Sequence, residues 1–414
     1  MSQELKTYLV GGAVRDQLLG REIKDRDYVV VGATPEQMLE NGFKPVGADF
    51  PVFLHPQTHE EYALARTERK SGQGYHGFVF KADPTVTLED DLQRRDLTIN
   101  AMAQDADGEI IDPYGGLEDL QNKVLRHVSD AFAEDPVRVL RVARFMARYA
   151  HLGFRVHTET IALMRQLVEA GEVDTLVAER VWQEIKAAIN EKTPSAFIQT
   201  LRDCGALKVL LPEIDCLFGV PQTKRWHPEV DTGVHVMMAM DKAADMENIV
   251  AFAVLVHDLG KGITPQDILP SHHGHEEGGV PLVEAVCERL RVPRNYRRLA
   301  VLVCRWHLHA HTVVEIKAKT LEKVFAAMNA YRQPQQLEYF IQACQADATG
   351  RLGEEFEQYP QADYIRQAFA AADDIDIKPL LEAGFSGPQL GERIRRLRIK
   401  AIDHFKKQAA VEGV

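Results

Sequence analysis

The character of the sequence changes near Glu134, and this change restricts the fold more than any other feature. Before it, short β-branched or apolar runs alternate with Gly, Pro and Asp, a pattern typical of strands joined by turns. After it, apolar residues recur with helical spacing to the end of the chain. The sequence therefore predicts an α+β fold, in which a head with a mixed sheet and helices is followed by an all-helical remainder.

Each part of the chain has its own expected elements. In the first part, strands are predicted at residues 8–10, 28–31, 51–54, 62–65 and 109–111, helices at 13–19 and 35–41, and a loop over 66–87. Asp135 followed by Pro136 predicts a helix start, because an Asp cap precedes a Pro in the first turn. Further helices are predicted at 158–169, 178–190, 194–204, 234–246 and 249–259. The expected domains are 1–133, 134–226, 227–350 and 351–414.

Composition excludes several classes of protein. A chain of 414 residues with 45% hydrophobic and 27% charged residues is not a collagen, a coiled coil or a disordered protein. Its net charge of −12 argues against indiscriminate coating of nucleic acid but leaves room for a local basic groove. Five scattered cysteines without a CxxC pair indicate a reducing compartment. With no signal pattern and no long apolar stretch, the expected location is the cytoplasm, without a membrane partner.

A glycine turn and two carboxylates in the head point to phosphate chemistry. Gly11-Gly12 links a strand to a helix, where backbone N–H groups and Arg15 can hold an anion. Asp25 and Asp27 stand two residues apart, so both carboxylates face one side of an extended segment. Mg²⁺ would relieve their repulsion and would take substrate phosphate oxygens as further ligands. A polar turn is the alternative, and a role for Glu61 as a third acidic ligand stays open.

Arginines are expected to complete the anion site. The segment 94–100 carries two arginines and an asparagine beside an apolar run, which suits triphosphate and ribose contacts. Four more arginines fall within about a third of the circumference of the helix that follows Asp135: Arg138, Arg141, Arg144 and Arg148. Because the rest of this helix is apolar, the stripe is predicted to line a cleft for phosphate or carboxylate. A solvated face with extended arginines is the alternative.

Histidines are concentrated in the C-terminal part. Nine of the sixteen lie within residues 227–311. Among them, His257 and Asp258 form a doublet that ends an apolar helix, which is costly unless the charges are paired or bind a metal. His235 lies upstream of this doublet. Mixed imidazole and carboxylate donors suit Ni²⁺, Co²⁺ or Mn²⁺ better than Mg²⁺.

In this order and spacing, the motifs GGAVRD, KDRD, RRDLTIN and EDPVRVLRVAR resemble those of class II tRNA nucleotidyltransferases, the family of CCA-adding enzymes and bacterial poly(A) polymerases. The resemblance implies a polymerase-β-like nucleotidyltransferase head at 1–133 and a helical neck and body at 134–226. ATP, CTP and tRNA would be the partners. Asp25 and Asp27 would be catalytic and would bind Mg²⁺. The nucleotide-binding residues carried over are Gly12, Arg15, Arg95, Asp135, Arg138, Arg141 and Arg144.

The pattern His…His-Asp…Asp resembles the HD phosphohydrolase superfamily, an all-helical metal-dependent hydrolase fold. The resemblance implies an HD domain at 227–350 with a helical tail at 351–414, and His257 and Asp258 as catalytic residues. A transition metal such as Ni²⁺ would be held by His235, His257, Asp258 and Asp347. His273 and His307 are candidates for a second metal or for phosphate contacts, and His311 fits a surface position. The family also implies phosphatase, 2′-nucleotidase and 2′,3′-cyclic phosphodiesterase activities.

Asp135 and Arg138, which the resemblance assigns to base recognition, have complementary hydrogen-bonding roles. A carboxylate only accepts hydrogen bonds and a guanidinium only donates them. Cytosine and adenine present an amino donor beside a ring-nitrogen acceptor, whereas uracil and guanine present the reverse pattern. One Asp–Arg pair is therefore expected to accept CTP and ATP and to reject UTP and GTP without a template.

The expected function is CCA addition to tRNA combined with phosphohydrolysis, in a monomer or homodimer, and two other functions stay open. A poly(A) polymerase-type RNA adenylyltransferase is disfavoured by the HD residues and the acidic composition. A non-catalytic tRNA-binding regulator is disfavoured because Asp25 and Asp27 are both present. Basic clusters at 291–298 and 393–400 are interpreted either as tRNA backbone contacts or as solvated helix faces.

Overall fold

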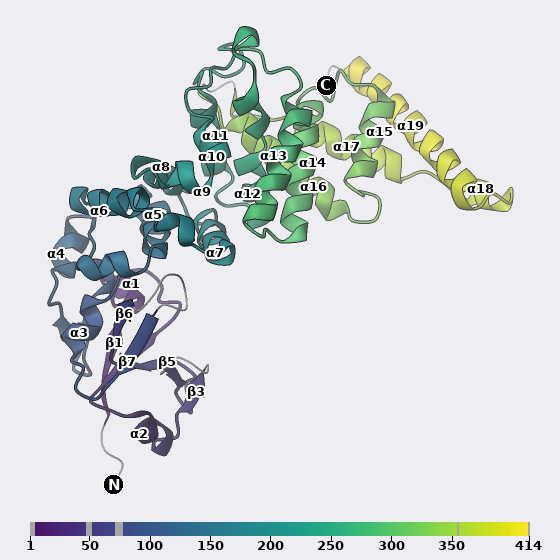
Figure 1. Cartoon of the computed structure of the whole chain (residues 1–414). Helices are drawn as coiled ribbons and strands as arrows, with labels where there is room; N and C mark the ends of the chain where they lie inside the picture. Colours follow the sequence, from purple (N-terminus) through teal and green to yellow (C-terminus); the bar gives the residue numbers. More distant parts are fainter. Residues whose placement is uncertain (1–4, 47–51, 71–77, 354–355, 413–414) are drawn as a thin grey trace. The chain divides into compact units, whose positions relative to one another are not determined.

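The computed structural model describes residues 5–46, 52–70, 78–353 and 356–412, which form two compact units. The first unit comprises residues 1–188 and 196–210, and the second comprises 189–195 and 211–414. Figure 1 traces their elements in chain order. The predicted α+β class is confirmed, with a mixed sheet in the head and mostly helices after it. Within the described ranges, no helix combines the length and apolar character that crossing a bilayer requires.

A seven-stranded sheet forms the core of the first unit. Its order is β3-β4-β5-β2-β1-β8-β9. The strands are β1 (Lys6–Val10), β2 (Asp27–Val31), β3 (Lys44–Val46), β4 (Val52–Leu54), β5 (Glu61–Leu64), β8 (Ala103–Gln104) and β9 (Ile110–Ile111). Val29 and Val30 of β2 are each 1% exposed, and such β-branched residues suit a central strand with both faces covered.

The register of three strands places the two motifs of the head side by side. β1 runs antiparallel to β2 with Val10 opposite Asp27, and β2 runs parallel to β5 with Asp27 opposite Glu61. The chain leaves β1 at Val10 and turns at Gly11, whose φ of +68° favours glycine. The glycine turn therefore starts at the end of the sheet where Asp27 begins its strand.

Helices surround this sheet and extend the first unit. They are α1 (Gly12–Leu18), α2 (Pro35–Glu40), α3 (Leu88–Gln93), α4 (Gly116–Gln121), α5 (Val137–Tyr149), α6 (Thr158–Glu169), α7 (Ala178–Ala188), α8 (Ser195–Asp203) and α9 (Ala206–Leu210). A short parallel pair, β10 (Val124–Leu125) with β11 (Arg155–Val156), interrupts the helical pattern. α5 packs along α7. The predicted helix start is confirmed within two residues, and Asp135 accepts a hydrogen bond from the Val137 N–H at 3.1 Å.

The prediction of a loop over 66–87 is wrong for residues 66–70 and 78–82, and it holds for 83–87. β6 (Arg66–Lys70) and β7 (Phe78–Ala82) pair as an antiparallel two-stranded sheet, whereas residues 71–77 lie outside the described ranges. Arg66 to Lys70 is polar at every position, so it lacks the alternation of apolar and polar residues that identifies a half-buried strand. The strand β6 forms through its backbone pairing with β7, although its side chains lack this alternation.

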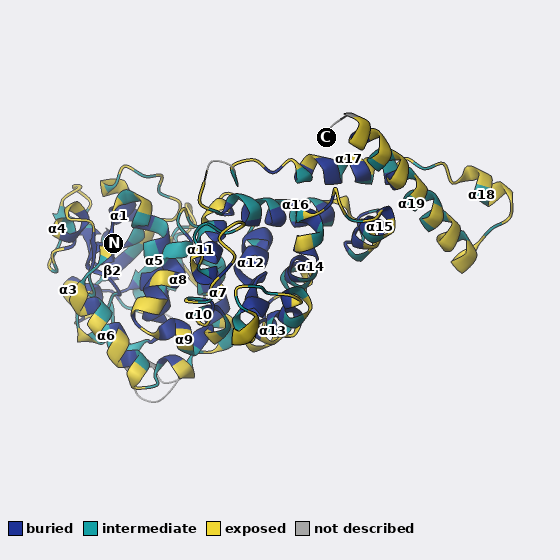
Figure 2. Ribbon diagram, turned by 90° about the horizontal axis from the view of Figure 1, so that it is seen from above, coloured by how far each residue is buried: buried dark blue, intermediate teal, exposed yellow. Residues whose placement is uncertain are grey.

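The second unit is helical and is organised around one buried helix. Its helices are α10 (Pro212–Asp215), α11 (Thr232–Lys242), α12 (Asn248–Val256), α13 (His275–Arg289), α14 (Arg294–His311), α15 (Ala318–Ala327), α16 (Pro334–Thr349), α17 (Gln361–Asp373), α18 (Lys378–Glu382) and α19 (Gly387–Glu412). Every residue from Ile249 to Val256 is buried, because α11, α14 and α16 all pack on α12. Figure 2 shows this contrast, with α12 buried along its length and α18 and α19 largely exposed.

Two glycines allow the close approaches that bring polar residues together in this unit. A Cβ at Gly260, in the 3-10 helix Leu259–Ile263, would lie 1.9 Å from the His275 carbonyl oxygen. A Cβ at Gly350, just after α16, would lie 2.4 Å from the Cα of Ala239 in α11. Such distances are possible only without a side chain. Gly260 thus brings the end of α12 against α13, and Gly350 brings α16 against α11.

We expect Gly260→Ala to destabilise the chain by about 1–3 kcal/mol, because the added methyl group must displace backbone atoms in a packed core. Gly391→Ala is the matched control, since a Cβ at this exposed position of α19 meets no atom within 4 Å. It should be neutral or stabilise the helix by about 0.5–1 kcal/mol. Urea unfolding followed by tryptophan fluorescence measures both effects. Equal behaviour of the two variants would contradict the packing described for Gly260.

Candidate active sites

A cavity of about 800 Å³ opens in the head where the sheet meets α5 and α7. The described residues that line it include nine arginines and five acidic residues. The arginines are Arg15, Arg66, Arg94, Arg95, Arg138, Arg141, Arg144, Arg148 and Arg180. The prediction that the arginine stripe of α5 lines a cleft is confirmed, because all four of its members face this cavity. An excess of guanidinium groups suits a polyanionic ligand.

Asp27, the first residue of β2, lies on the wall of this cavity. Asp25 precedes it by two residues in the chain. Loss of surrounding water raises the pKa of Asp27, and the charge of Asp25 raises it further against the opposing effect of Arg95. Glu61 lies next to Asp27 in the register of β5. The neighbouring carboxylates fit a divalent cation that prefers oxygen ligands, because such an ion would replace the lost water at Asp27 and reduce the repulsion from Asp25.

The glycine turn lies directly under an arginine. A Cβ at Gly11 would lie 2.7 Å from a terminal nitrogen of Arg95, so the backbone and the guanidinium are in close contact there. Arg15, in the middle of the short helix α1, is buried, donates a hydrogen bond to the Asn100 side chain and lies 5.3 Å from the ring centres of Phe145 and Tyr149. Arg15 is thus held rigidly at the cavity wall.

Buried carboxylates hold most of the other arginines in place. Asp91 pairs with Arg94 at 2.7 Å and with Arg95 at 3.2 Å. Asp96 pairs with Arg141 at 2.7 Å. Burial alone would raise the pKa of Asp96, but the charge of Arg141 and the Asn100 hydrogen bond hold it well below its usual range. The other two pairs are Arg144 with Glu184 at 2.7 Å and Arg148 with Asp16 at 3.2 Å.

The structure shows Asp135 and Arg138 in the cavity wall with partners that the sequence did not indicate. Both oxygens of Asp135 accept from Arg180 of α7, at 2.7 and 3.1 Å. Arg138 donates to the main-chain oxygens of Ala131 at 2.7 Å and Arg94 at 2.6 Å. Arg180 was missed because it lies 45 residues after Asp135 and has no motif of its own, apart from its place on a helix that faces α5.

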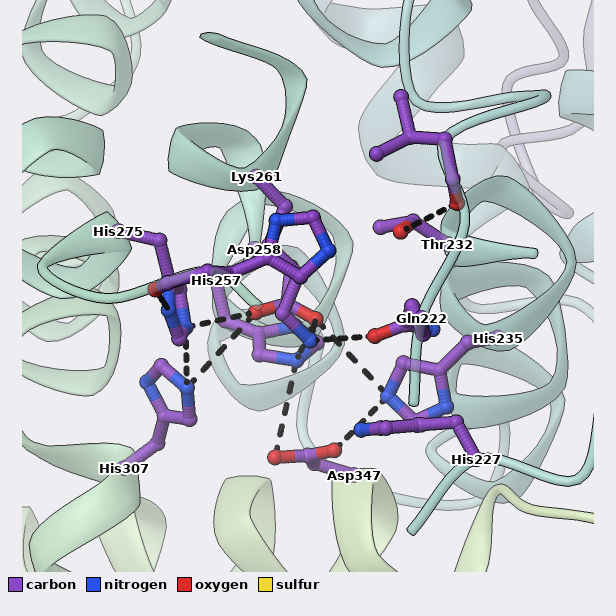
Figure 3. A network of polar contacts seen from close by, with 12 residues as sticks. Gln222, His227, Thr232, His235, His257, Asp258, Lys261, His275, His307 and Asp347 are labelled. Carbon is purple, nitrogen blue, oxygen red and sulfur yellow. Dashed lines mark hydrogen bonds and ion pairs between the residues drawn. The ribbon is translucent and has the colours of Figure 1, made fainter. Parts of the chain in front are cut away.

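The second site is a buried cluster of histidines and carboxylates inside the helical unit (Figure 3). Nε2 of His235 lies 2.9 Å from an oxygen of Asp347 and 4.0 Å from an oxygen of Asp258. Nε2 of His257 lies 3.3 Å from Asp258 and 3.6 Å from Asp347. All four side chains are at most 4% exposed. The structure therefore brings together the four residues that were predicted as metal ligands.

Two more histidines complete the cluster, and one of them differs from the prediction. Nε2 of His275 and Nε2 of His307 lie 3.3 Å apart, at 3.3 and 3.7 Å from Asp258 Oδ1. His273, predicted as a candidate for a second metal or for phosphate contacts, lies outside this cluster but lines the adjoining cavity, so its phosphate contact stays a prediction. It is exposed in the turn before Gly274, whereas His275 begins α13 and is buried. His311 is not a surface residue either, because its Nε2 lies 2.7 Å from Asp347.

The hydrogen bonds of these rings indicate that the cluster fits cations. Nδ1 of His257, His275 and His307 lies 2.7–3.1 Å from main-chain carbonyl oxygens. A carbonyl oxygen needs a donor, so Nδ1 carries the proton and Nε2 keeps its lone pair. The Nε2 atoms thus point lone pairs at one another and at Asp258, whose Oδ1 lacks a hydrogen-bond partner among the described residues and whose Oδ2 lies 2.6 Å from Lys261 Nζ. Nitrogen and carboxylate donors in this arrangement suit a transition metal.

Protonation is the alternative way to relieve this cluster. Burial lowers the pKa of His257, but the charges of Asp258 and Asp347 outweigh burial and raise it to about 10 in the metal-free site. Lys261 Nζ also lies 2.6 Å from Asp258 and 2.6 Å from the side-chain oxygen of Gln222. A cavity of about 990 Å³ opens at the cluster and is lined by Lys261, among other residues. A ligand phosphate in that cavity would reach the cluster beside a buried ammonium group.

The basic cluster at 393–400 is largely engaged within its own unit. Arg395 pairs with Glu322 at 2.9 Å and Arg396 pairs with Glu392 at 3.1 Å. Arg393 and Arg398 lie over the rings of Phe385 and Tyr331, at 3.7 and 3.3 Å from their centres. These contacts favour the interpretation as a helix face that packs on α15 and its neighbours.

Comparison with known proteins identifies a known domain around each of these two sites. The poly A polymerase head domain matches residues 7–126, the "Probable RNA and SrmB- binding site of polymerase A" matches 153–217, and the HD domain matches 232–351. The Multifunctional CCA protein of Thioalkalivibrio sulfidiphilus (strain HL-EbGR7) is 58% identical over 406 residues, which cover 98% of this chain and 99% of that protein. The chain belongs to the family of multifunctional CCA proteins.

Solved structures share the fold of this family member. The Thermotoga maritima CCA-adding enzyme complexed with tRNA aligns with a TM-score of 0.63 at 22% identity, over 99% of this chain and 92% of that one. The Bacillus stearothermophilus CCA-adding enzyme in complex with CTP aligns with a TM-score of 0.65 at 21% identity, over 97% of this chain and 89% of that one. At these identities the likeness shows a common fold.

We expect His275→Ala to reduce the number of transition-metal ions bound by the chain, because it removes one donor from the group of three formed by Asp258, His275 and His307. His273→Ala is the matched control, since this neighbouring histidine is exposed outside the cluster. Isothermal titration with Co²⁺, in excess Mg²⁺, measures the number of ions for each variant. If His273→Ala lost an ion and His275→Ala kept it, the assignment of donors would be wrong.

Proposed function

We propose that this chain is a CCA-adding tRNA nucleotidyltransferase whose helical unit is a metal-dependent phosphohydrolase. One observation carries the first part: the head cavity places Asp27 beside the Gly11 turn, beneath a lining that includes nine arginines. A nucleoside triphosphate has the charge for such a lining. The 58% identical Multifunctional CCA protein supports the specific activity, as do fold relatives described in complex with tRNA, CTP and ATP.

In this proposal the residues of the head have three tasks. Asp25 and Asp27 hold Mg²⁺, which when bound lowers the pKa of the attacking tRNA 3′-hydroxyl and stabilises the pyrophosphate leaving group. The triphosphate is bound by Gly12, Arg15, Arg95, Arg141 and Arg144. Because carboxylates hold these arginines in defined positions, little side-chain ordering remains to be done when the nucleotide binds. The 3′-hydroxyl attacks the α-phosphate in line with the departing pyrophosphate.

Asp135 and Arg138 read the base. A carboxylate offers about four acceptor positions, of which Arg180 uses two and the Val137 N–H uses one. One position stays available for the amino group that cytosine and adenine share. Arg138 would donate to the adjacent ring nitrogen, while its two main-chain contacts hold the guanidinium plane. Uracil and guanine would face Asp135 with a carbonyl oxygen, which is repelled.

The helical unit would hydrolyse phosphate esters, with phosphatase, 2′-nucleotidase and 2′,3′-cyclic phosphodiesterase activities. His235, His257, Asp258 and Asp347 would hold a transition metal such as Ni²⁺, and His275 and His307 would add a second set of donors. A metal bound there supplies an activated water and stabilises charge on the phosphate. Lys261, buried beside Asp258 at the adjoining cavity, is placed to contact the anionic substrate.

A poly(A) polymerase-type activity is the second candidate, because the poly A polymerase head domain matches residues 7–126. Tail length and nucleotide use distinguish the two. With tRNA that lacks CCA, a CCA-adding enzyme first incorporates CMP from CTP and stops after one AMP. Long tracts made from ATP alone would identify the polymerase instead.

We expect Asp135→Ala to relax discrimination against UTP and GTP. Each lost charge-assisted hydrogen bond should weaken binding of the correct nucleotide by about 1.5–3 kcal/mol. Arg138→Ala should behave in the same way. Arg165→Gln, on the exposed side of α6 with a main-chain partner at Asp203, is the control and should keep full selectivity. Ratios of kcat/KM for CTP, ATP, UTP and GTP measure the selectivity of each variant. Unchanged ratios in both Asp135→Ala and Arg138→Ala would mean that other residues recognise the base.

The two activities should separate by mutation, because their donor sets belong to different units and suit different metals. Asp27→Ala should abolish CMP and AMP addition and leave hydrolysis of a 2′,3′-cyclic nucleotide. His257→Ala should abolish transition-metal-dependent hydrolysis while tRNA extension proceeds with Mg²⁺. Both activities are assayed on each purified variant after circular dichroism has verified its fold. Loss of both activities in one folded variant would contradict the two-site proposal.

A further inference from the structure

The rings of the histidine cluster are held from outside in two different ways. His257, His275 and His307 each place Nδ1 against a main-chain carbonyl, at 2.7 Å from Val254, 2.7 Å from His272 and 3.0 Å from Cys304. These partners belong to the backbone, so substitution cannot remove them. His235 differs, because its Nδ1 lies 3.1 Å from a side-chain oxygen, Oε1 of Glu229.

Glu229 is buried and directed at this contact. Its side chain is 0% exposed, and the same oxygen also lies 2.9 Å from Nδ1 of His227. It precedes Val230, a β-branched residue with φ of +63°, a conformation that such residues rarely adopt. The turn is closed by hydrogen bonds from the Gln222 N–H to Val230 and from the Val230 N–H to His227. The surrounding chain thus imposes the turn that brings this carboxylate to His235.

We propose that Glu229 is a positioning residue for the metal site: it accepts the Nδ1 proton of His235 and thereby directs the Nε2 lone pair toward Asp347 and Asp258. The inference rests on the proposed metal-dependent function of this unit. A neutral imidazole binds a metal through one nitrogen only while the other carries the proton. A carboxylate behind that proton fixes the ring and makes the ligating nitrogen more basic.

His227, Glu229 and His235 also lie close enough to be donors for an ion of their own. That arrangement would use Nδ1 of His235, and Nε2 would then carry the proton and donate it to Asp347 at 2.9 Å instead of binding the ion of the cluster. The cluster around Nε2 offers His257 and two carboxylates, whereas the other side offers His227 and one carboxylate. The geometry therefore favours Glu229 as a proton acceptor, and the separate ion becomes an outcome of the test.

The test is titration of the full chain with Co²⁺ in excess Mg²⁺, followed by calorimetry and by the visible absorption of the bound ion. Glu229→Gln should weaken Co²⁺ binding by about 10- to 100-fold and change the absorption spectrum, with the number of ions unchanged. Glu276→Gln is the matched control. This carboxylate lies 3.6 Å from Nδ1 of His275, whose proton is already accepted by the His272 carbonyl, so its effect should stay below about threefold.

Each of the other binding outcomes contradicts either the inference about Glu229 or the proposed function of the unit. If wild-type and Glu229→Gln chains bind Co²⁺ equally, the inference is wrong while the proposed metal site stands. If Glu229→Gln and His227→Ala each lose one ion, these residues are ligands of a separate ion and the inference is wrong. If the wild-type chain binds no Co²⁺, the proposed function of the unit fails together with it. Should Glu229→Gln not fold by near-ultraviolet circular dichroism, Glu229→Asp, which withdraws the carboxylate by one methylene group, takes its place in the same comparison.

Discussion

An ionised side chain that leaves water without a counter-charge costs several kcal/mol, and this cost organises both units of the chain. In the head, Asp91 and Asp96 are 0% and 6% exposed, and arginines neutralise both of them. The pairing stabilises both partners. The arginines allow the carboxylates to be buried, and the carboxylates hold the guanidinium groups at the cavity wall. An anion-binding surface of fixed shape results from groups that would otherwise repel one another.

The helical unit meets the same constraint in another way. Its carboxylates, Asp258 and Asp347, are surrounded by imidazoles, whose protons face outward to carbonyl oxygens and to Glu229. The neutral rings carry no charge, but their inward lone pairs add to the negative potential of the carboxylates. Lys261 supplies one positive charge at Asp258. Arg351 lies 3.5 Å from Asp347, and a proton on His257, whose pKa the two carboxylates raise, or a metal cation would occupy the lone pairs that face inward.

The two sites therefore differ in chemistry for a structural reason. The head offers carboxylate oxygens at the start of a strand, and oxygen donors of this kind suit Mg²⁺ together with substrate phosphates. The helical unit offers imidazole nitrogens from four helical segments, and such donors suit transition metals. One chain can thus hold two metal-dependent sites with little competition between them for the same ion.

Features carried by neighbouring residues could be predicted from the sequence. The arginine stripe of α5 follows from helical spacing, and the doublet of His257 and Asp258 follows from its place at the end of an apolar run. The β6–β7 pair was missed because its first strand is polar throughout. His273 was preferred over His275 although the turn at Gly274 separates an exposed position from a buried one. A difference of two residues decides which ring enters the core, and local pattern does not show it.

The sequence by itself determined the class of each unit, the two acidic and histidine motifs, and the face on which α5 carries its arginines, because each depends on residues within a few turns of one another. Only the tertiary structure decided the contacts between distant segments, including the contact of Asp347 with His235, which the motif resemblance had implied. Arg180 meets Asp135 because α7 packs on α5, and Asp347 meets His235 because Gly350 lets α16 approach α11. Such pairings depend on distances between segments far apart in the chain, which packing sets and local composition does not encode.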